Sequence, residues 1–212
     1  KLKIELIVKN KKKIIVFASG SGTNFINLFN NICNGKIILL ITNNSNCGAL
    51  QFAKKNKIKF IVINKFRYPN DEARKKEYEL VLNFHKPDLI LLAGFMKIIP
   101  ENIINIYQNK IMNIHPSLLP KYGGKGFYGH RVHEAVINSR DKESGATVHF
   151  VDAKYDKGPI IMQTKVQVKN NDDAISLSKR ILEEEYKLYS KVVSLFCEDK
   201  IVVKNNSVII YE

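Results

Sequence analysis

Two polar residues, Asn113 and His115, stand two positions apart where a short apolar run gives way to a loop at Pro116. The apolar run is typical of a buried strand, and Pro116 with the glycines behind it is typical of a loop. On an extended strand, side chains two positions apart point to the same face. An amide donor and an imidazole placed side by side suit charge stabilisation at one reacting atom better than core packing. The spacing therefore predicts a catalytic pair.

A second candidate site follows the first apolar run, Ile14–Ala18, which has the length of a central strand. The turn Ser19–Asn24 has glycines at positions 20 and 22 and leads into a helical pattern. Such a turn forms a phosphate site when the N–H groups of the helix N-terminus receive the anion. Phe25 takes the place of the third glycine of a dinucleotide fingerprint, and no Gly-Lys-Ser/Thr follows, which disfavours a dinucleotide site and a P-loop. A plain tight turn is the alternative.

The elements that would position these residues alternate between apolar strands and amphipathic helices. Strands are expected at residues 14–18, 37–42, 58–64, 88–93, 110–114, 146–151 and 159–168. Helices are expected at residues 25–32, 49–56, 71–86, 100–108, 130–138 and 173–196, followed by a terminal hairpin over 201–211. This order predicts an α/β protein with a mostly parallel central sheet flanked by helices. We expect one domain over residues 1–212, with 1–13 as an extension leading into the first core strand.

Ligands of such sheets bind beyond the carboxyl ends of the strands. This rule collects four segments at one edge of the sheet, namely residues 20–24, 94–99, 113–124 and 152–158. A site made from them would hold a phosphate at one end and Asn113, His115 and an aspartate at the other.

The composition narrows the classes of partner. The 212 residues include 34 basic and 20 acidic ones, a formal net charge of +14, but the lysines are spread along the chain and only Lys11–Lys13 cluster. No aromatic residues interleave with that cluster, which disfavours a nucleic-acid partner, and an anionic small substrate would also gain from the positive field. No apolar run approaches about 18 residues, and the N-terminus lacks a signal-peptide pattern, so we expect no membrane partner.

Cysteines and histidines give no metal signature. The three cysteines, Cys33, Cys47 and Cys197, are odd in number and scattered, which argues against a disulfide framework and a zinc site and fits a reducing cytoplasm. His130 and His133 lie three apart on an expected helix, yet no third ligand of matching spacing accompanies them. We expect no metal.

Five motifs occur in an order and spacing that match a known family. They are Gly20-Ser-Gly-Thr-Asn24, Ala93-Gly-Phe-Met-Lys97, Asn113-Ile-His-Pro-Ser-Leu-Leu-Pro-Lys-Tyr122, Gly145-Ala-Thr-Val-His-Phe150 and Asp156-Lys-Gly-Pro159. Together they resemble the phosphoribosylglycinamide formyltransferases, folate-dependent enzymes of purine synthesis, over residues 14–196. The resemblance implies a Rossmann-like formyltransferase fold with a long C-terminal helix and a terminal hairpin.

The resemblance also implies a reaction and its residues. The formyl group of 10-formyltetrahydrofolate, a co-substrate, passes to the amine of 5'-phosphoribosylglycinamide (glycinamide ribonucleotide). The catalytic trio of the family falls on Asn113, His115 and Asp156. Residues implied to bind glycinamide ribonucleotide are Gly22, Thr23, Asn24 and, at its amine end, Glu185. Residues implied to bind the folate are Met96, Lys97, Ile98, Ile99, Asn113, Asp152, Ala153, Lys154, Tyr155 and Asp156.

The residue types of the trio suit direct attack by the amine on the formyl carbon. Asn113 and a protonated His115 would donate hydrogen bonds to the oxyanion of the tetrahedral intermediate. Asp156 would favour the imidazolium, orient the ring and help a proton move, through water, from the amine to the leaving N10. Ser117 follows a proline and lacks a nucleophile elbow, so no covalent intermediate is expected.

Some positions stand outside the family pattern. Where many members have an arginine that contacts the folate tail, this chain has Asp71, with Arg67 and Arg74 nearby as candidates to replace it. The loop after Tyr122 reads Gly-Gly-Lys-Gly-Phe-Tyr-Gly-His rather than a shorter Pro-Gly form. His149 alternates with apolar neighbours on its strand, and we expect it to be a structural hydrogen-bonding residue behind the site.

Three other functions are alternatives. A formyltetrahydrofolate deformylase would send water to the formyl group, but it normally carries a further N-terminal domain, for which roughly 13 residues are too few. A methionyl-tRNA formyltransferase would add a C-terminal barrel that grips tRNA. A non-catalytic mononucleotide-binding module would keep Gly20–Asn24 and have no use for the trio. We expect a cytoplasmic enzyme that acts on small molecules, as a monomer or homodimer.

Overall fold

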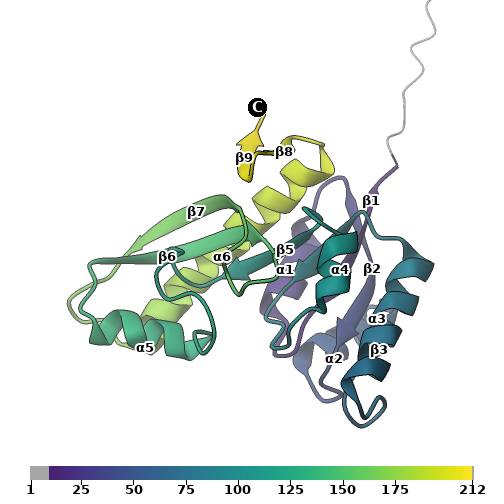
Figure 1. Cartoon of the computed structure of the whole chain (residues 1–212). Helices are drawn as coiled ribbons and strands as arrows, with labels where there is room; N and C mark the ends of the chain where they lie inside the picture. The colour runs from purple at the N-terminus through teal and green to yellow at the C-terminus, as the bar shows by residue number, and fades with distance from the viewer. Residues whose placement is uncertain (1–9, 212) are drawn as a thin grey trace, which may run out of the picture.

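The apolar runs of the sequence form the strands of a central sheet in the computed structural model, which describes residues 10–211 (Figure 1). The strands of this sheet are β1 (Lys12–Phe17), β2 (Gly35–Thr42), β3 (Phe60–Val62), β4 (Leu89–Leu92), β5 (Ile111–His115), β6 (Glu143–Phe150) and β7 (Ile160–Gln167). The helices are α1 (Thr23–Asn31), α2 (Gly48–Lys55), α3 (Asp71–His85), α4 (Glu101–Ile106), α5 (His130–Asn138) and α6 (Ala174–Cys197). A terminal hairpin, β8 (Ile201–Lys204) and β9 (Ser207–Ile210), forms a separate two-stranded sheet.

The central sheet has the strand order β3-β2-β1-β4-β5-β6-β7. The pairs from β3 to β5 are all parallel, whereas β6 pairs antiparallel with both β5 and β7. A loop without a crossover helix joins β6 to β7, and such a short connection requires an antiparallel pair. The predicted mostly parallel sheet, the long C-terminal helix and the terminal hairpin are confirmed.

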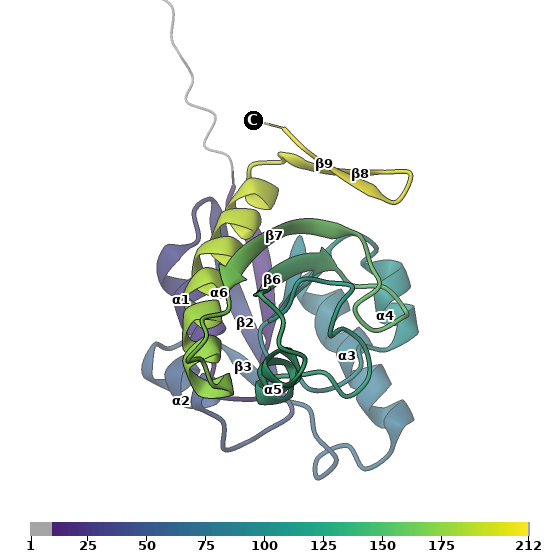
Figure 2. The ribbon, with the colours of Figure 1, turned by 90° about the vertical axis from the view of Figure 1, so that its left-hand side faces the viewer.

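Helices cover both faces of the sheet. Successive side chains of β1 point to opposite faces, and from Ile14 onward both sets are apolar, so each face needs a cover. Ile14 and Val16 enter the core beneath α1, α2, α5 and α6, whereas Ile15 and Phe17 enter the core beneath α3 and α4. Figure 2 shows α1, α2 and α6 on one side of the sheet and α3 and α4 on the other. The buried Tyr189 of α6 donates its hydroxyl to the carbonyls of Leu92 (3.1 Å) and Met112 (3.0 Å), so that α6 is anchored to β4 and β5.

The face beneath α3 and α4 is only partly covered at β5 and β6. Ile111 of β5 packs in the α3–α4 core, so Asn113 and His115 point to that same face by strand alternation. In the register of β5 with β6, Asn113 lies opposite His149 and His115 opposite Thr147. Because α4 spans only six residues, loops rather than a helix complete this face, which leaves room for a ligand.

All predicted boundaries agree with the structure within three residues, and the largest difference is at the start of β6. The first strand begins at Lys12 and β6 at Glu143, both earlier than predicted, because polar residues at the end of a strand still join the ladder. The edge strand β3 is shorter than predicted. Residues 1–9 of the predicted extension lie outside the described residues, and within residues 10–211 no helix is long and apolar enough to cross a membrane.

Candidate active site

The structure brings Asn113, His115 and Asp156 together, with His149 between them. His115 Nδ1 lies 3.8 Å from Asp156 Oδ2, and His149 Nε2 lies 3.5 Å from Asp156 Oδ1. Asn113 Nδ2 lies 3.1 Å from His149 Nε2. The expectation that His149 stands behind the site is therefore wrong: its buried ring touches two members of the trio. Cross-strand pairing with Asn113 puts it there, which the sequence pattern of one strand does not reveal.

Backbone carbonyls fix the tautomers of both imidazoles, because a carbonyl only accepts hydrogen bonds. The carbonyl of Tyr122 lies 2.7 Å from His115 Nε2, so Nε2 carries a hydrogen and Nδ1 is the ring nitrogen that faces Asp156. The carbonyl of Phe150 lies 2.8 Å from His149 Nδ1, so Nε2 of that ring is the acceptor. It receives an N–H of Asn113, which orients the Asn113 amide with its NH₂ group towards the site.

The surroundings lower the pKa values of both His115 and Asp156. Burial lowers the pKa of His115, and neither the charge of Asp156 nor the carbonyl of Tyr122 fully offsets this effect. Burial by itself would raise the pKa of Asp156, but contacts with His149, His115 and the N–H of Gly124 (2.8 Å) outweigh it and lower the pKa. That His115 is protonated when it donates to the oxyanion stays a prediction.

Contrary to the prediction, the loop that carries Asp156 does not begin at the edge of the sheet where the carboxyl ends of the parallel strands lie. Since β6 is antiparallel, the loop after it starts near Ile111, at the opposite edge, where the N–H of Val151 donates to the Ile111 carbonyl at 2.9 Å. The loop then folds back, with Asp156 at a left-handed φ of 53°. Gly158 makes this possible, since a Cβ there would lie 1.9 Å from the carbonyl oxygen of Phe150.

A pocket of about 640 Å³ opens over the trio. It is lined by Asn113, His115, His149 and Asp156, by the predicted folate residues Met96, Lys97, Ile98, Ile99, Asp152, Ala153, Lys154 and Tyr155, and by residues 124–129. Apolar walls come from Phe95, Ile104 and Val151. The volume and the mixture of apolar walls with few polar groups are typical of small-molecule sites. Residues 125–129 lie beyond the segment 113–124 that was predicted for this edge, although Gly126 and Gly129 were a usable signal for a loop.

The predicted phosphate loop lies next to this pocket. Gly22 has a φ of 81° at the N-cap of α1, and a Cβ there would lie 2.7 Å from Ala49 Cα. Within the described residues no side chain caps α1, and its first turn contains no acidic residue, so its N–H groups are available to an anion. Ser19 joins the loop to the pocket wall, since its N–H donates to the Gly94 carbonyl (3.1 Å) and its hydroxyl accepts the N–H of Met96 (3.0 Å).

Comparison with known proteins adds an independent line of evidence. A family model described as formyl transferase matches residues 12–193. The chain belongs to the formyl transferase family.

Two relatives of this formyl transferase match it closely over most of its length. It is 42% identical over 203 residues to the chloroplastic phosphoribosylglycinamide formyltransferase of Arabidopsis thaliana, covering 93% of this chain and 70% of the relative. The crystal structure of phosphoribosylglycinamide formyltransferase from Anaplasma phagocytophilum is 35% identical, with a TM-score of 0.85 and 95% of both chains covered. The chain is therefore an enzyme that transfers formyl groups, as predicted.

A second solved structure bears on the alternative of hydrolysis. A formyltetrahydrofolate deformylase from Pseudomonas syringae has a TM-score of 0.85, with 95% of this chain and 66% of that one covered. Its sequence identity is only 22%. That likeness shows the shared fold alone.

Glu185 of this formyl transferase lies beside the phosphate loop and does not line the pocket. Asn24 Nδ2 donates to Glu185 Oε2 at 2.8 Å, and both side chains are buried. Burial raises the pKa of Glu185 to about 7, against a smaller opposing effect of the bond from Asn24. Oδ1 of Asn24 has no hydrogen-bond partner within residues 10–211. Asn24 and Glu185 thus form a buried hydrogen-bonded pair between α1 and α6, and Oδ1 of Asn24 is an acceptor that a ligand could use.

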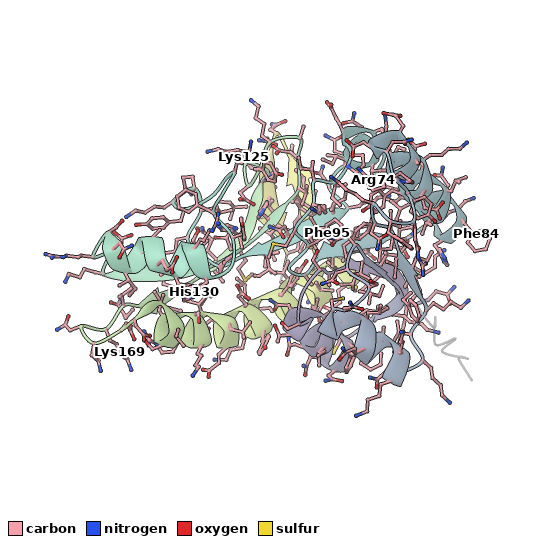
Figure 3. All side chains as sticks on the ribbon, turned by 90° about the horizontal axis from the view of Figure 1, so that it is seen from below. Arg74, Phe84, Phe95, Lys125, His130 and Lys169 are labelled. Carbon is pink, nitrogen blue, oxygen red and sulfur yellow. The ribbon has the colours of Figure 1, made fainter. Side chains whose placement is uncertain are left out.

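The basic residues at the pocket are lysines rather than the arginines near Asp71. Arg74, on α3 in Figure 3, is engaged with the side chain of Asp71 and with the carbonyls of Tyr68 (2.7 Å) and Pro69 (3.1 Å). The lysines that line the pocket are Lys97, Lys125 and Lys154. In the described part of the chain none of the three forms an ion pair, so they are available to an anionic ligand.

No metal-binding constellation occurs among the described residues, since no group of three or more His, Cys, Asp or Glu side chains could hold an ion. His130 lies 3.4 Å from Glu134 on α5. His133 is buried, which lowers its pKa to about 4 and keeps its ring neutral.

Proposed function

We propose that this formyl transferase moves the formyl group of 10-formyltetrahydrofolate to the amine of 5'-phosphoribosylglycinamide, giving formylglycinamide ribonucleotide and tetrahydrofolate in de novo purine synthesis. The observation that carries the proposal is that Asn113, His115 and Asp156 line one pocket, with His115 Nδ1 3.8 Å from the Asp156 carboxylate. The names of its relatives support the same reaction.

The site chemistry follows from the protonation states. The folate supplies a formyl group on N10, and His115 Nδ1 accepts the proton that the amine loses as it bonds to the formyl carbon. Asp156 stabilises the imidazolium that results, and the second N–H of Asn113 donates to the oxyanion of the tetrahedral intermediate. His115 then returns the proton to N10 as the bond between carbon and N10 breaks.

The pocket suits a flat ring with an anionic tail. In the proposal, the pterin lies against residues 96–99 and 152–155, between the apolar walls of the pocket. The tail carboxylates meet Lys97, Lys125 and Lys154, which replace the arginine contact of other family members. Lys125 lies on the loop after β5, apart from Arg74 in sequence and in element (Figure 3).

The phosphoribosyl substrate occupies the neighbouring loop in this proposal. The N–H groups of Gly22, Thr23 and Asn24 receive its phosphate at the N-terminus of α1, and Glu185 with Asn24 binds the same molecule beyond it. That Glu185 holds the amine end stays a prediction. Free thiols at Cys33, Cys47 and Cys197 support a reducing compartment such as the cytoplasm.

A three-way assay separates the proposal from hydrolysis and from formylation of tRNA. The enzyme is given 10-formyltetrahydrofolate with glycinamide ribonucleotide, with water alone, or with charged initiator tRNA, and release of tetrahydrofolate is followed. We expect release only with glycinamide ribonucleotide, matched by an equal amount of formylated product. Release at the same rate in water would identify a deformylase and refute the proposal.

A further inference from the structure

One carboxylate outside the pocket holds the turn that follows the catalytic strand. Asp141 lies in the connection between α5 and β6, and its two oxygens accept hydrogen bonds from Lys121 Nζ at 2.7 and 2.6 Å. Oδ2 also accepts the hydroxyl of Tyr122 at 2.8 Å. Asp141 thus binds the side chains of two successive residues of one turn.

The same turn carries the group that fixes the tautomer of His115. The backbone of Tyr122 has a left-handed φ of 54°, and its carbonyl accepts the hydrogen of His115 Nε2 at 2.7 Å. A non-glycine residue keeps such a conformation only where its surroundings hold it. The hydroxyl bond to Asp141 and the packing of the Tyr122 ring against Phe127, with centroids 5.9 Å apart, are side-chain contacts that do so.

Asp141 acts at a distance from the reacting atoms. It does not line the pocket of the trio; it lines a hollow on the other side of the turn, together with Lys121 and Tyr122. The hydrogen bonds from Lys121 and then from Tyr122 lower its pKa, so it remains an ionised acceptor at neutral pH. Its effect on chemistry must therefore pass through Tyr122.

We infer that Asp141 is a positioning residue for formyl transfer: by holding Tyr122, it keeps the Tyr122 carbonyl on His115 Nε2 and leaves Nδ1 free to face Asp156. The effect on the rate rests on the proposed function. The effect on the tautomer of His115 does not rest on it, because the tautomer can be observed in the protein without substrates.

The test compares Asp141→Ala with Glu143→Ala. Glu143 is a matched control, because it is another carboxylate paired with a lysine (Lys165 Nζ, 2.9 Å), and its hydrogen bonds join it to β7 through Lys165 and Gln167 rather than to the turn. Nitrogen-15 NMR of the His115 ring reports the tautomer, and steady-state kinetics report kcat and KM. For Asp141→Ala we expect mixed Nδ1–H and Nε2–H tautomers and a kcat lower by about 10- to 100-fold, with both KM values within about threefold. Glu143→Ala should match the wild type, and Asp141→Asn, which retains an acceptor for Tyr122, should restore most of kcat.

An Asp141→Ala protein with the wild-type tautomer and the kcat of the control would overturn the inference. If Asp141→Ala does not fold, Tyr122→Phe deletes only the hydroxyl bond and must still produce a mixed tautomer; an unchanged ring there overturns it equally. A wild-type enzyme that fails to formylate glycinamide ribonucleotide refutes the proposed function instead, and the tautomer comparison still decides the role of Asp141.

Discussion

Burial shifts the pKa values of His115, in the pocket, and of Glu185, beside the predicted phosphate loop, in the direction that favours the neutral form of each. It lowers the pKa of His115 and raises the pKa of Glu185 to about 7. Asp156 behaves differently, because its contacts with two imidazoles and with the N–H of Gly124 outweigh its burial. The candidate site therefore holds an imidazole of lowered pKa beside a carboxylate of lowered pKa.

The raised pKa of Glu185 predicts how the stability of the fold depends on pH. Its folded pKa of about 7 lies above the ordinary value of 4.5. The folded state therefore binds more protons between those values, and stability falls as pH rises through that window. Glu185→Gln keeps an acceptor for Asn24 and has no proton to lose. We expect its free energy of unfolding, relative to wild type, to rise by about 2 kcal/mol between about pH 5 and pH 8.

Urea unfolding of both proteins at the two pH values measures this difference. Glu184→Gln on the same helix, whose carboxylate pairs with Lys187 at the surface, is the control and should show no comparable trend. If the difference in the free energy of unfolding between Glu185→Gln and wild type does not change with pH, the pKa of Glu185 is not raised in the fold.

At the scale of elements, the apolar pattern of a segment predicted that it is a strand and which side chains share a face. It did not predict which strand lies beside it, or in which direction that neighbour runs. The apolar run before Asn113 and the alternation around it were enough to predict that Asn113 and His115 share a face. The antiparallel placement of β6 was not predictable in this way, because strand periodicity does not encode the direction of a neighbour. For this reason His149 was predicted behind the site, although pairing puts it opposite Asn113.

For the loop before α1, in contrast, the local sequence was enough to predict the structure. The glycines at positions 20 and 22 predicted a turn leading into a helix N-terminus, and Gly22 indeed has a positive φ and a close neighbour in Ala49. We expect Gly22→Ala to cost about 1–3 kcal/mol of stability. It should also raise the KM for glycinamide ribonucleotide about tenfold while leaving the KM for the folate unchanged, because only the phosphate-binding turn shifts.

Gly20→Ala is the matched control in the same turn, since a Cβ there meets nothing within 4 Å. Thermal unfolding and initial rates with each substrate varied in turn would measure both effects. Equal KM values for the two variants would contradict the role assigned to Gly22 in phosphate binding.

At the scale of the whole molecule, the fold joins two candidate binding regions that lie apart in the sequence. Residues 20–24, 94–99 and 113–124 follow neighbouring parallel strands, and the loop 152–158 folds back to meet them. Ser19 links the phosphate loop to the pocket wall through Gly94 and Met96. The net charge of +14 would draw both proposed substrates, a phosphate ester and a folate with carboxylates, to this region.

In the proposed reaction, proton transfer depends on the charge of Asp156. Asp156→Asn tests it most directly, because the amide keeps the shape of the side chain and an acceptor for the N–H of Gly124. The measurement is kcat for formyl transfer to glycinamide ribonucleotide, with substrate binding and thermal unfolding recorded on the same protein. We predict a kcat lower by about 10²- to 10⁴-fold, with binding and unfolding temperature close to wild type. A variant that keeps wild-type turnover would contradict the account.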